Sequence, residues 1–225
     1  MISYHLTWDL YLTGFSSVDA GRNPWLRFYA MAIAAAFLFV SGISLGLAYR
    51  HTIRWDRFLR RLAIISAAAL VVTIGSWLMF PGSFIYFGIL HCIALSSVLV
   101  LPFLRLPVVI LVVAAGVAFA LPFQINGFFG DGWLQWPALV LGLENIPLRS
   151  NDYVPLLPWF GFVLLGLAAS RLIKPYQAGT PPRWQATGRL GRLMTWAGRN
   201  SLPIYLLHQP ILIGLLMGLA SLLRP

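Results

Sequence analysis

A histidine and an aspartate stand one helical turn apart near the start of the chain. His5 and Asp9 occupy positions i and i+4 of the apolar stretch Met1–Gly14. Residues at this spacing are neighbours on one face of a helix. A carboxylate there can hold an imidazole in one tautomer and stabilise its protonated form, as in a base–orienter dyad. The alternative is a buried ion pair that only locks the first helix to its neighbours. We favour the first interpretation, with His5 as the base and Asp9 as its orienting group.

Two more histidines lie inside apolar runs. His91 follows Gly88 by three residues, and Ser201, Tyr205 and His208 fall at i, i+4 and i+7, which is one helical stripe. Polar groups are costly in hydrocarbon, so such a stripe faces protein or a water-filled cavity. Ionisable residues at this depth are candidate functional residues. For His91 and His208, a hydrogen bond between helices explains the residue as well as catalysis does.

The composition defines the class of protein. Hydrophobic residues make up 59% of the chain and charged residues only 10%, against about 25% in a soluble domain. The net charge of +10 follows from arginines at alternate ends of the apolar runs, which is the pattern of membrane topology and not of nucleic-acid binding. The lone Cys92 excludes a disulfide framework and a thiolate metal cage.

Continuous apolar runs predict an all-α, polytopic transmembrane helix bundle forming one domain over residues 1–225. We expect about seven membrane segments, at 1–14, 28–49, 62–80, 84–101, 108–123, 156–172 and about 195–222. The first run is shorter than the roughly 20 residues that a crossing needs, and too polar for a signal peptide. We therefore expect a first helix truncated at its cytoplasmic end.

The loop at 124–155 contains a tryptophan-rich segment, 132–143, that is too short to span a bilayer. We expect an interfacial or re-entrant segment with Trp133 and Trp136 at the headgroups. Both rings could also stack on a sugar. Asp152, in the same loop, is a candidate substrate-binding carboxylate.

The distribution of basic residues predicts the orientation of the chain in the membrane. Eleven lie on one side, in the segments 50–61, 102–107 and 171–192, and four lie on the other, at positions 22, 27, 149 and 224. The richer side is expected to be cytoplasmic, which places the C-terminus outside an inner, multi-pass cell membrane protein. Topology and anionic lipid explain most of these arginines. Phosphates of a cytoplasmic donor are the alternative partners, with four candidate ligands: Arg54, Arg105, Arg171 and Arg199.

Several motifs together carry a family resemblance. They are YH and WDL at 4–5 and 8–10, FLFVSG at 37–42, FGILHCIA at 87–94, WFG at 159–161, and GRNS with IYLLHQP at 198–201 and 204–210. In their order and spacing the chain resembles the bacterial heparan-α-glucosaminide N-acetyltransferase-like membrane family, one of the transmembrane acyltransferases. Relatives begin with an Asp-x-x-Arg-Gly segment that this chain lacks.

The resemblance implies transfer of an acetyl or similar acyl group from cytoplasmic acyl-CoA to a sugar amine or hydroxyl on the far side. Acetyl-CoA would be a co-substrate, with no permanently bound cofactor and no metal. The partners would be the lipid bilayer, acyl-CoA and a glycan or glycolipid acceptor, with a homo-oligomer left open. A histidine would act as acyl carrier or as general base: His5 first, His91 second and His208 in support. Asn200, Ser201 and Tyr205 would donate hydrogen bonds to the oxyanion.

Two other classes compete with an enzyme. Two facing intramembrane histidines can serve as axial ligands in a haem-binding electron carrier, which a Soret band would reveal. A polar cavity can also belong to a transporter or lipid-handling scaffold, which would act in proteoliposomes without acyl-CoA.

Overall fold

The computed structural model describes residues 1–125, 134–143, 150–173 and 188–223. All regular structure in these ranges is helical. The chain divides into two compact units, each described by itself: unit 1 comprises Met1–Ile33 and Pro175–Pro225, and unit 2 comprises Ala34–Lys174.

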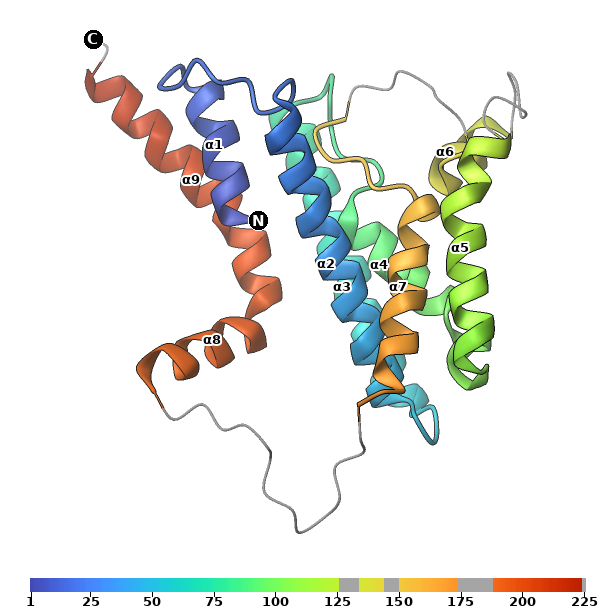
Figure 1. Ribbon diagram of the computed structural model, residues 1–225. Coiled ribbons are helices and arrows are strands. Elements are labelled where there is room, and N and C mark those ends of the chain that lie inside the picture. The colour runs from blue at the N-terminus through green and yellow to red at the C-terminus, as the bar shows by residue number, and fades with distance from the viewer. Residues whose placement is uncertain (126–133, 144–149, 174–187, 224–225) are drawn as a thin grey trace. The chain divides into compact units, whose positions relative to one another are not determined.

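Unit 1 contains α1 (Ile2–Leu12), the start of α2 (Pro24–Ala48), α8 (Arg189–Arg199) and α9 (Ser201–Leu223). The short α1 lies beside α9, and α8 turns away from the α9 axis (Figure 1). The side chains of Ser3 and Tyr29 are 2.8 Å apart, which joins α1 to the beginning of α2.

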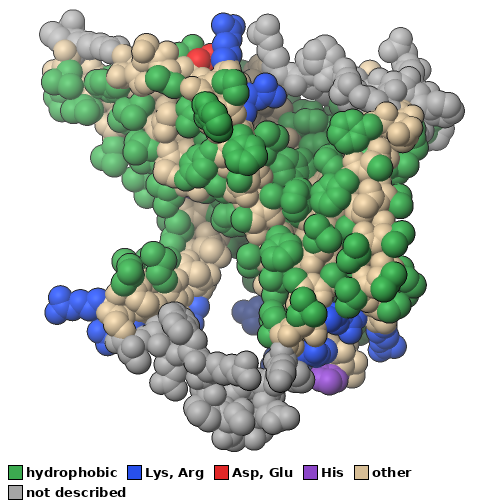
Figure 2. Space-filling view, in the orientation of Figure 1, with side chains coloured by type: hydrophobic (Ala, Val, Ile, Leu, Met, Phe, Trp, Pro, Cys, Tyr) green, Lys and Arg blue, Asp and Glu red, His purple; other side chains and the backbone are tan. Residues whose placement is uncertain are grey.

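Unit 2 contains the rest of α2 and the helices that follow it. These are α3 (Trp55–Met79), α4 (Ile89–Leu99), the 3-10 helix η1 (Leu101–Arg105), α5 (Val108–Ile125), α6 (Gln135–Leu141) and α7 (Leu156–Ser170). Figure 2 shows hydrophobic side chains over the sides of this unit and Lys and Arg side chains at the end where α2 and α3 are joined.

Four described helices, α2, α3, α5 and α9, are long and apolar enough to cross a membrane. Large apolar side chains project outward from them, with Leu78 70% and Phe123 83% exposed. In a soluble protein such exposure would be unusual, but lipid is the natural partner of these faces. The chain is therefore an α-helical membrane protein. Of the other expected segments, α4 and α7 are apolar but shorter, and α1 has 11 residues.

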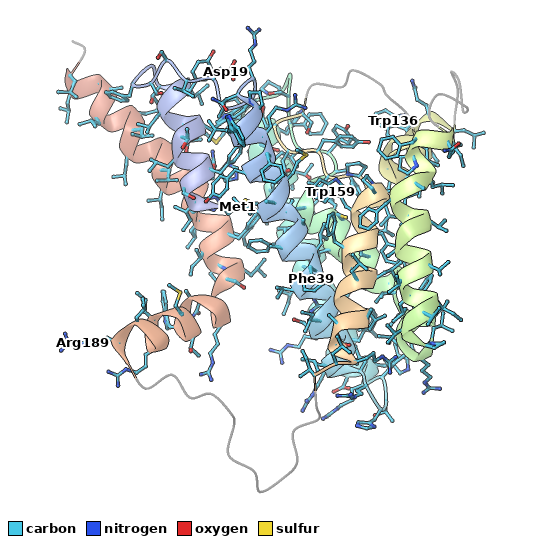
Figure 3. All side chains as sticks on the ribbon, in the orientation of Figure 1. Met1, Asp19, Phe39, Trp136, Trp159 and Arg189 are labelled. Carbon is cyan, nitrogen blue, oxygen red and sulfur yellow. The ribbon has the colours of Figure 1, made fainter. Side chains whose placement is uncertain are left out.

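Helices α2 and α7 pack through glycines. A Cβ atom at Gly42 would collide with the Val163 carbonyl, and one at Gly166 with the Phe39 carbonyl. Small residues let the two backbones approach closely, as in membrane helix pairs with a small-xxx-small pattern. Figure 3 labels Phe39 on α2 and Trp159 on α7.

The predicted fourth helix, 84–101, was too long at its start, because the structure begins α4 at Ile89. Two hydroxyls of α3 hold the preceding segment out of the helix. Ser76 Oγ accepts the Ile85 N–H at 2.9 Å, and Thr73 Oγ1 donates to the Ile85 carbonyl at 2.8 Å. Side chains that satisfy backbone groups in this way compete with helical hydrogen bonding.

The predicted last helix, from about Thr195 to Leu222, is two helices that meet at Asn200. The Asn200 amide donates to the Trp196 carbonyl at 2.9 Å and ends α8. Pro203 then falls in the first turn of α9, where a helix does not need its N–H. The segment up to Arg192, expected to be a loop, already belongs to α8 from Arg189 onward. Basic and apolar residues alternate there at helical spacing, as in an interfacial amphipathic helix.

Candidate active site

Two of the predicted histidines meet where α1 packs beside α9. The rings of His5 and His208 have their centroids 4.9 Å apart, with an angle of 59° between their planes. His208 is 9% exposed, and His5 is half-buried. Since two adjacent imidazolium rings would repel each other, at least one ring of the pair is neutral. The structure thus brings together two residues that are 203 positions apart in the sequence.

The hydrogen bond of His208 assigns its tautomer. Nδ1 lies 2.6 Å from the Tyr205 carbonyl oxygen, which can only accept, so Nδ1 carries the proton. When the His208 ring is neutral, its Nε2 carries a lone pair. This atom is buried and has no hydrogen-bond partner among the described residues. His208 therefore has the two features of a positioned base: one nitrogen anchored by a fixed acceptor and the other unprotonated and available.

Asp9 contacts α9 and not the histidine on its own helix. Its side chain is completely buried, and Oδ1 accepts a hydrogen bond from Gln209 Nε2 at 2.9 Å. In the part of the chain that the structure describes, no hydrogen bond joins Asp9 to His5. The geometry therefore supplies an Asp9–Gln209 link between helices, in place of the predicted His5–Asp9 orienting contact.

Three buried side-chain atoms at the contact between α1 and α9 share one property. Asp9 Oδ2, Gln209 Oε1 and His208 Nε2 lack a partner within the described residues, and all three are acceptors. Buried polar atoms are nearly always paired, so unpaired ones need an explanation such as a bound molecule. A group that presents hydrogen-bond donors, such as an amine, a hydroxyl or water, would satisfy them. We call this group of side chains, His5, Asp9, His208 and Gln209, the α1–α9 cluster.

His91 has a different environment, in unit 2. Its Nδ1 accepts the Gly88 N–H at 3.3 Å, and its Nε2 lies 3.2 Å from Thr73 Oγ1. Thr73 donates its own proton to Ile85, so Nε2 carries a proton and donates to Thr73. Both ring nitrogens are thus occupied, and the ring closes the start of α4. This is the local, structural interpretation of His91 that the sequence left open.

The predicted oxyanion donors of α9 lie near its start. Tyr205 is half-buried and next to His208, with ring centroids 5.7 Å apart. Ser201 is exposed, and the Asn200 amide is bonded to the end of α8. Of the three, Tyr205 is the one that the fold places against the α1–α9 cluster.

The predicted residues of the outer loop are described only in part. Trp133 lies outside the described residues. Trp136 is 64% exposed on α6, as an interfacial anchor would be (Figure 3). Asp152 is half-buried, and its Oδ2 accepts the Ile89 N–H at 3.3 Å at the start of α4. Burial raises the pKa of Asp152 to about 6, although this hydrogen bond opposes the shift.

The four candidate donor-binding arginines occupy helix ends. Arg54, Arg105 and Arg199 are exposed. Arg171 donates to the Leu104 carbonyl, which joins the end of α7 to η1. Arg61 is not among the predicted site residues, because it stands in a run of arginines that topology already explains. Its side chain nevertheless turns inward in unit 2.

A haem between His5 and His208 does not fit their arrangement. Axial ligands bind the iron from opposite faces of the porphyrin. The two rings contact each other at 4.9 Å and are strongly tilted, which leaves no room for a macrocycle between them. No group of three His, Cys, Asp or Glu side chains in the described ranges could hold a metal ion.

These features define a multi-span α-helical membrane protein with an imidazole pair and a carboxylate–amide pair buried between two helices. The family model for the heparan-alpha-glucosaminide N-acetyltransferase catalytic domain matches residues 1–210, and the chain belongs to this family. Its class of activity is that of a membrane acetyltransferase. Comparison with curated proteins and with solved structures yielded no match.

Proposed function

We propose that this protein moves an acetyl group from cytoplasmic acetyl-CoA to an amine or hydroxyl of a sugar on the extracytoplasmic side. The observation that carries the proposal is the buried His208 Nε2 atom, which has no hydrogen-bond partner among the described residues while Nδ1 is bonded to the Tyr205 carbonyl. Family membership gives the reaction class and supports acetyl-CoA as the donor. The excess of basic residues on one side of the predicted topology supports entry of the donor from the cytoplasm.

In direct transfer, His208 Nε2 takes the proton of the acceptor N–H or O–H while that atom attacks the thioester carbonyl. The C–S bond breaks, and the imidazolium returns the proton to the leaving CoA thiolate. In the covalent alternative, Nε2 itself attacks the thioester carbonyl, and the C–S bond breaks to release the CoA thiolate. The acceptor atom then attacks the acetyl carbon, the acetyl–Nε2 bond breaks, and the proton that the acceptor loses neutralises the thiolate. Both routes need Nε2 unprotonated and Nδ1 protonated. His5 is the neighbouring imidazole that can exchange a proton with His208.

The unpaired acceptors of the cluster support binding of the sugar acceptor. Asp9 Oδ2 and Gln209 Oε1 can accept hydrogen bonds from its N–H or O–H groups beside His208. Tyr205 is our candidate donor to the oxyanion, with Asn200 and Ser201 behind it at the start of α9. Trp133, Trp136 and Asp152 remain candidates for sugar contact from the outer loop.

The test uses purified protein in nanodiscs with radiolabelled acetyl-CoA and a panel of amino sugars and neutral sugars. We expect label transfer by the wild-type protein and loss of at least about 100-fold in His208→Asn, the usual range for a general base. His51→Gln, at an exposed position, is the matched histidine control. Wild-type turnover in folded His208→Asn would refute the assignment of His208. Acetylated protein detected by intact mass without acceptor would favour the covalent route.

The opposite assignment of roles to His5 and His208 can be tested directly. If His5 is the base and His208 only supports it, His5→Asn will abolish transfer while His208→Asn leaves a substantial fraction. Our proposal expects the opposite order. The two variants therefore decide between the order that the sequence suggested and the order that the hydrogen bonds support.

A further inference from the structure

Arg61 is half-buried, whereas its neighbours Arg54, Arg57 and Arg60 at the start of α3 are exposed. It lies six residues into α3, about 9 Å along the axis from Trp55. Its Nη1 donates to Ser97 Oγ of α4 at 3.3 Å, and its Nη2 donates to Ser41 Oγ of α2 at 3.4 Å. The guanidinium is half-buried, and three helices thus surround it.

The positive charge of Arg61 has no ion-pair partner among the residues that the structure describes. Within the described ranges, the one ion pair joins Arg22 and Asp19, in unit 1. Serine hydroxyls accept hydrogen bonds but carry no charge. Asp56, the acidic residue of α3, is exposed and stands about 140° around the helix from Arg61. Partial removal of a cation from water costs free energy unless an anion lies beside it. The position of Arg61 therefore favours binding of an anion.

Membrane topology does not explain the inward position. The positive-inside pattern requires basic residues near the ends of membrane segments, and the exposed residues Arg54, Arg57 and Arg60 already provide them. This pattern does not require an arginine whose guanidinium group is hydrogen-bonded to hydroxyls of two other helices. A guanidinium has five N–H donors, of which these serines use two, and its planar fork matches the oxygens of a phosphate.

A line of positive charge leads from the surface to Arg61. Arg57 precedes it by four residues and so lies on the same face of α3, and Arg54 is the residue directly before the helix. The N-terminus of α3 adds the positive end of its helix dipole at the same place. This arrangement suits a ligand with more than one phosphate group.

We propose that Arg61 is the inner residue of a phosphate-binding site between α2, α3 and α4, with Arg57 and Arg54 at its entrance. In the proposed function, on which this assignment of the ligand rests, the phosphates are those of the CoA donor. An anionic lipid headgroup is the other source of the same chemistry.

The test measures the affinity of CoA for the full chain in nanodiscs of neutral lipid. Arg61→Gln should weaken CoA binding at least about tenfold, as expected for loss of a charge-assisted contact. Arg60→Gln, one residue away and exposed, is the matched control and should stay within about twofold of wild type. Arg61→Lys keeps the positive charge but loses the planar guanidinium group, so an intermediate affinity for CoA is expected. This variant also tests the site if Arg61→Gln does not fold.

Native mass spectrometry with phosphatidylglycerol separates the two sources. If Arg61→Gln loses a retained anionic lipid but binds CoA normally, the phosphate site stands and its ligand is a lipid. If Arg61→Gln or Arg61→Lys behaves like Arg60→Gln with both probes, the site is refuted. If CoA binding depends on Arg61 but no acceptor is acetylated, the phosphate site stands and the proposed function fails.

Discussion

Replacement of Gln209 by leucine tests the link between α1 and α9 most directly. The Gln209 amide donates the hydrogen bond that Asp9 Oδ1 receives, at 2.9 Å, and the aspartate side chain is 0% exposed. Asp9 Oδ2 has no partner among the described residues. Gln209→Leu would therefore leave both oxygens of a buried carboxyl group unpaired.

The magnitude follows from the kind of bond. A hydrogen bond to a charged group contributes about 1.5–3 kcal/mol, and an unpaired buried partner adds its desolvation cost. We expect Gln209→Leu to lower the free energy of unfolding by about 2–3 kcal/mol, a large fraction of a typical total of about 5–15 kcal/mol. Leu207→Ala, at an outward-facing position that is 57% exposed, is the control and should change it by less than about 1 kcal/mol.

The assay is reversible unfolding in mixed micelles, with the double variant Asp9→Leu/Gln209→Leu beside the single ones. Replacing both partners removes the unpaired carboxyl group, so the double variant should regain at least about half of the lost stability. A single variant within about 0.5 kcal/mol of wild type would refute the reasoning, as would a double variant no better than the single one. If the double variant is stable but inactive, the pair also binds the acceptor.

Three further predictions concern unit 2. His91→Ala should lower the free energy of unfolding by about 1–3 kcal/mol, because the start of α4 loses its cap, while turnover per folded molecule persists; lost turnover at unchanged stability would contradict this. Gly42→Val should lower the melting temperature, because the new side chain meets the Val163 carbonyl, whereas Gly75→Val, with open space around it, should not. The pKa of Asp152 rises from 3.8 to about 6 on folding, so the folded state holds this proton more tightly. The stability that it contributes is complete below about pH 4 and is lost as the pH rises to about 6, a slope that Asp152→Asn should remove in pH-dependent unfolding.

Helix positions in this chain are predictable where prolines mark them. Pro107 and Pro155 precede α5 and α7, which begin where the sequence indicated, at Val108 and Leu156. The start of α4 was not predictable from hydropathy, because two hydroxyls from another helix hold the preceding segment out of the helix. Local pattern describes a segment's own preference, whereas tertiary hydrogen bonds decide where the helix begins.

The pairing of helices with one another was harder to predict than their positions along the sequence. α1 and α9 are apolar around most of their circumference, so neither has a strong amphipathic face that would indicate its neighbour. Spacing along the chain suggested a His5–Asp9 pair, yet Asp9 pairs with Gln209 on α9. One signal did point there: an amide beside His208 in a membrane helix is costly unless it has a partner, and a buried carboxyl group is the partner it finds.

The two units share a property that bears on mechanism. Among the residues that the structure describes, the α1–α9 cluster has acceptors without donors, and Arg61 is a cation without an anion. Unpaired groups left by chance would include both donors and acceptors, because a buried donor and a buried acceptor that lack partners cost comparable free energy. In the proposed reaction, one substrate carries N–H or O–H groups and the other carries the phosphates of CoA. Each of these two groups is therefore complementary to one substrate of the proposed reaction.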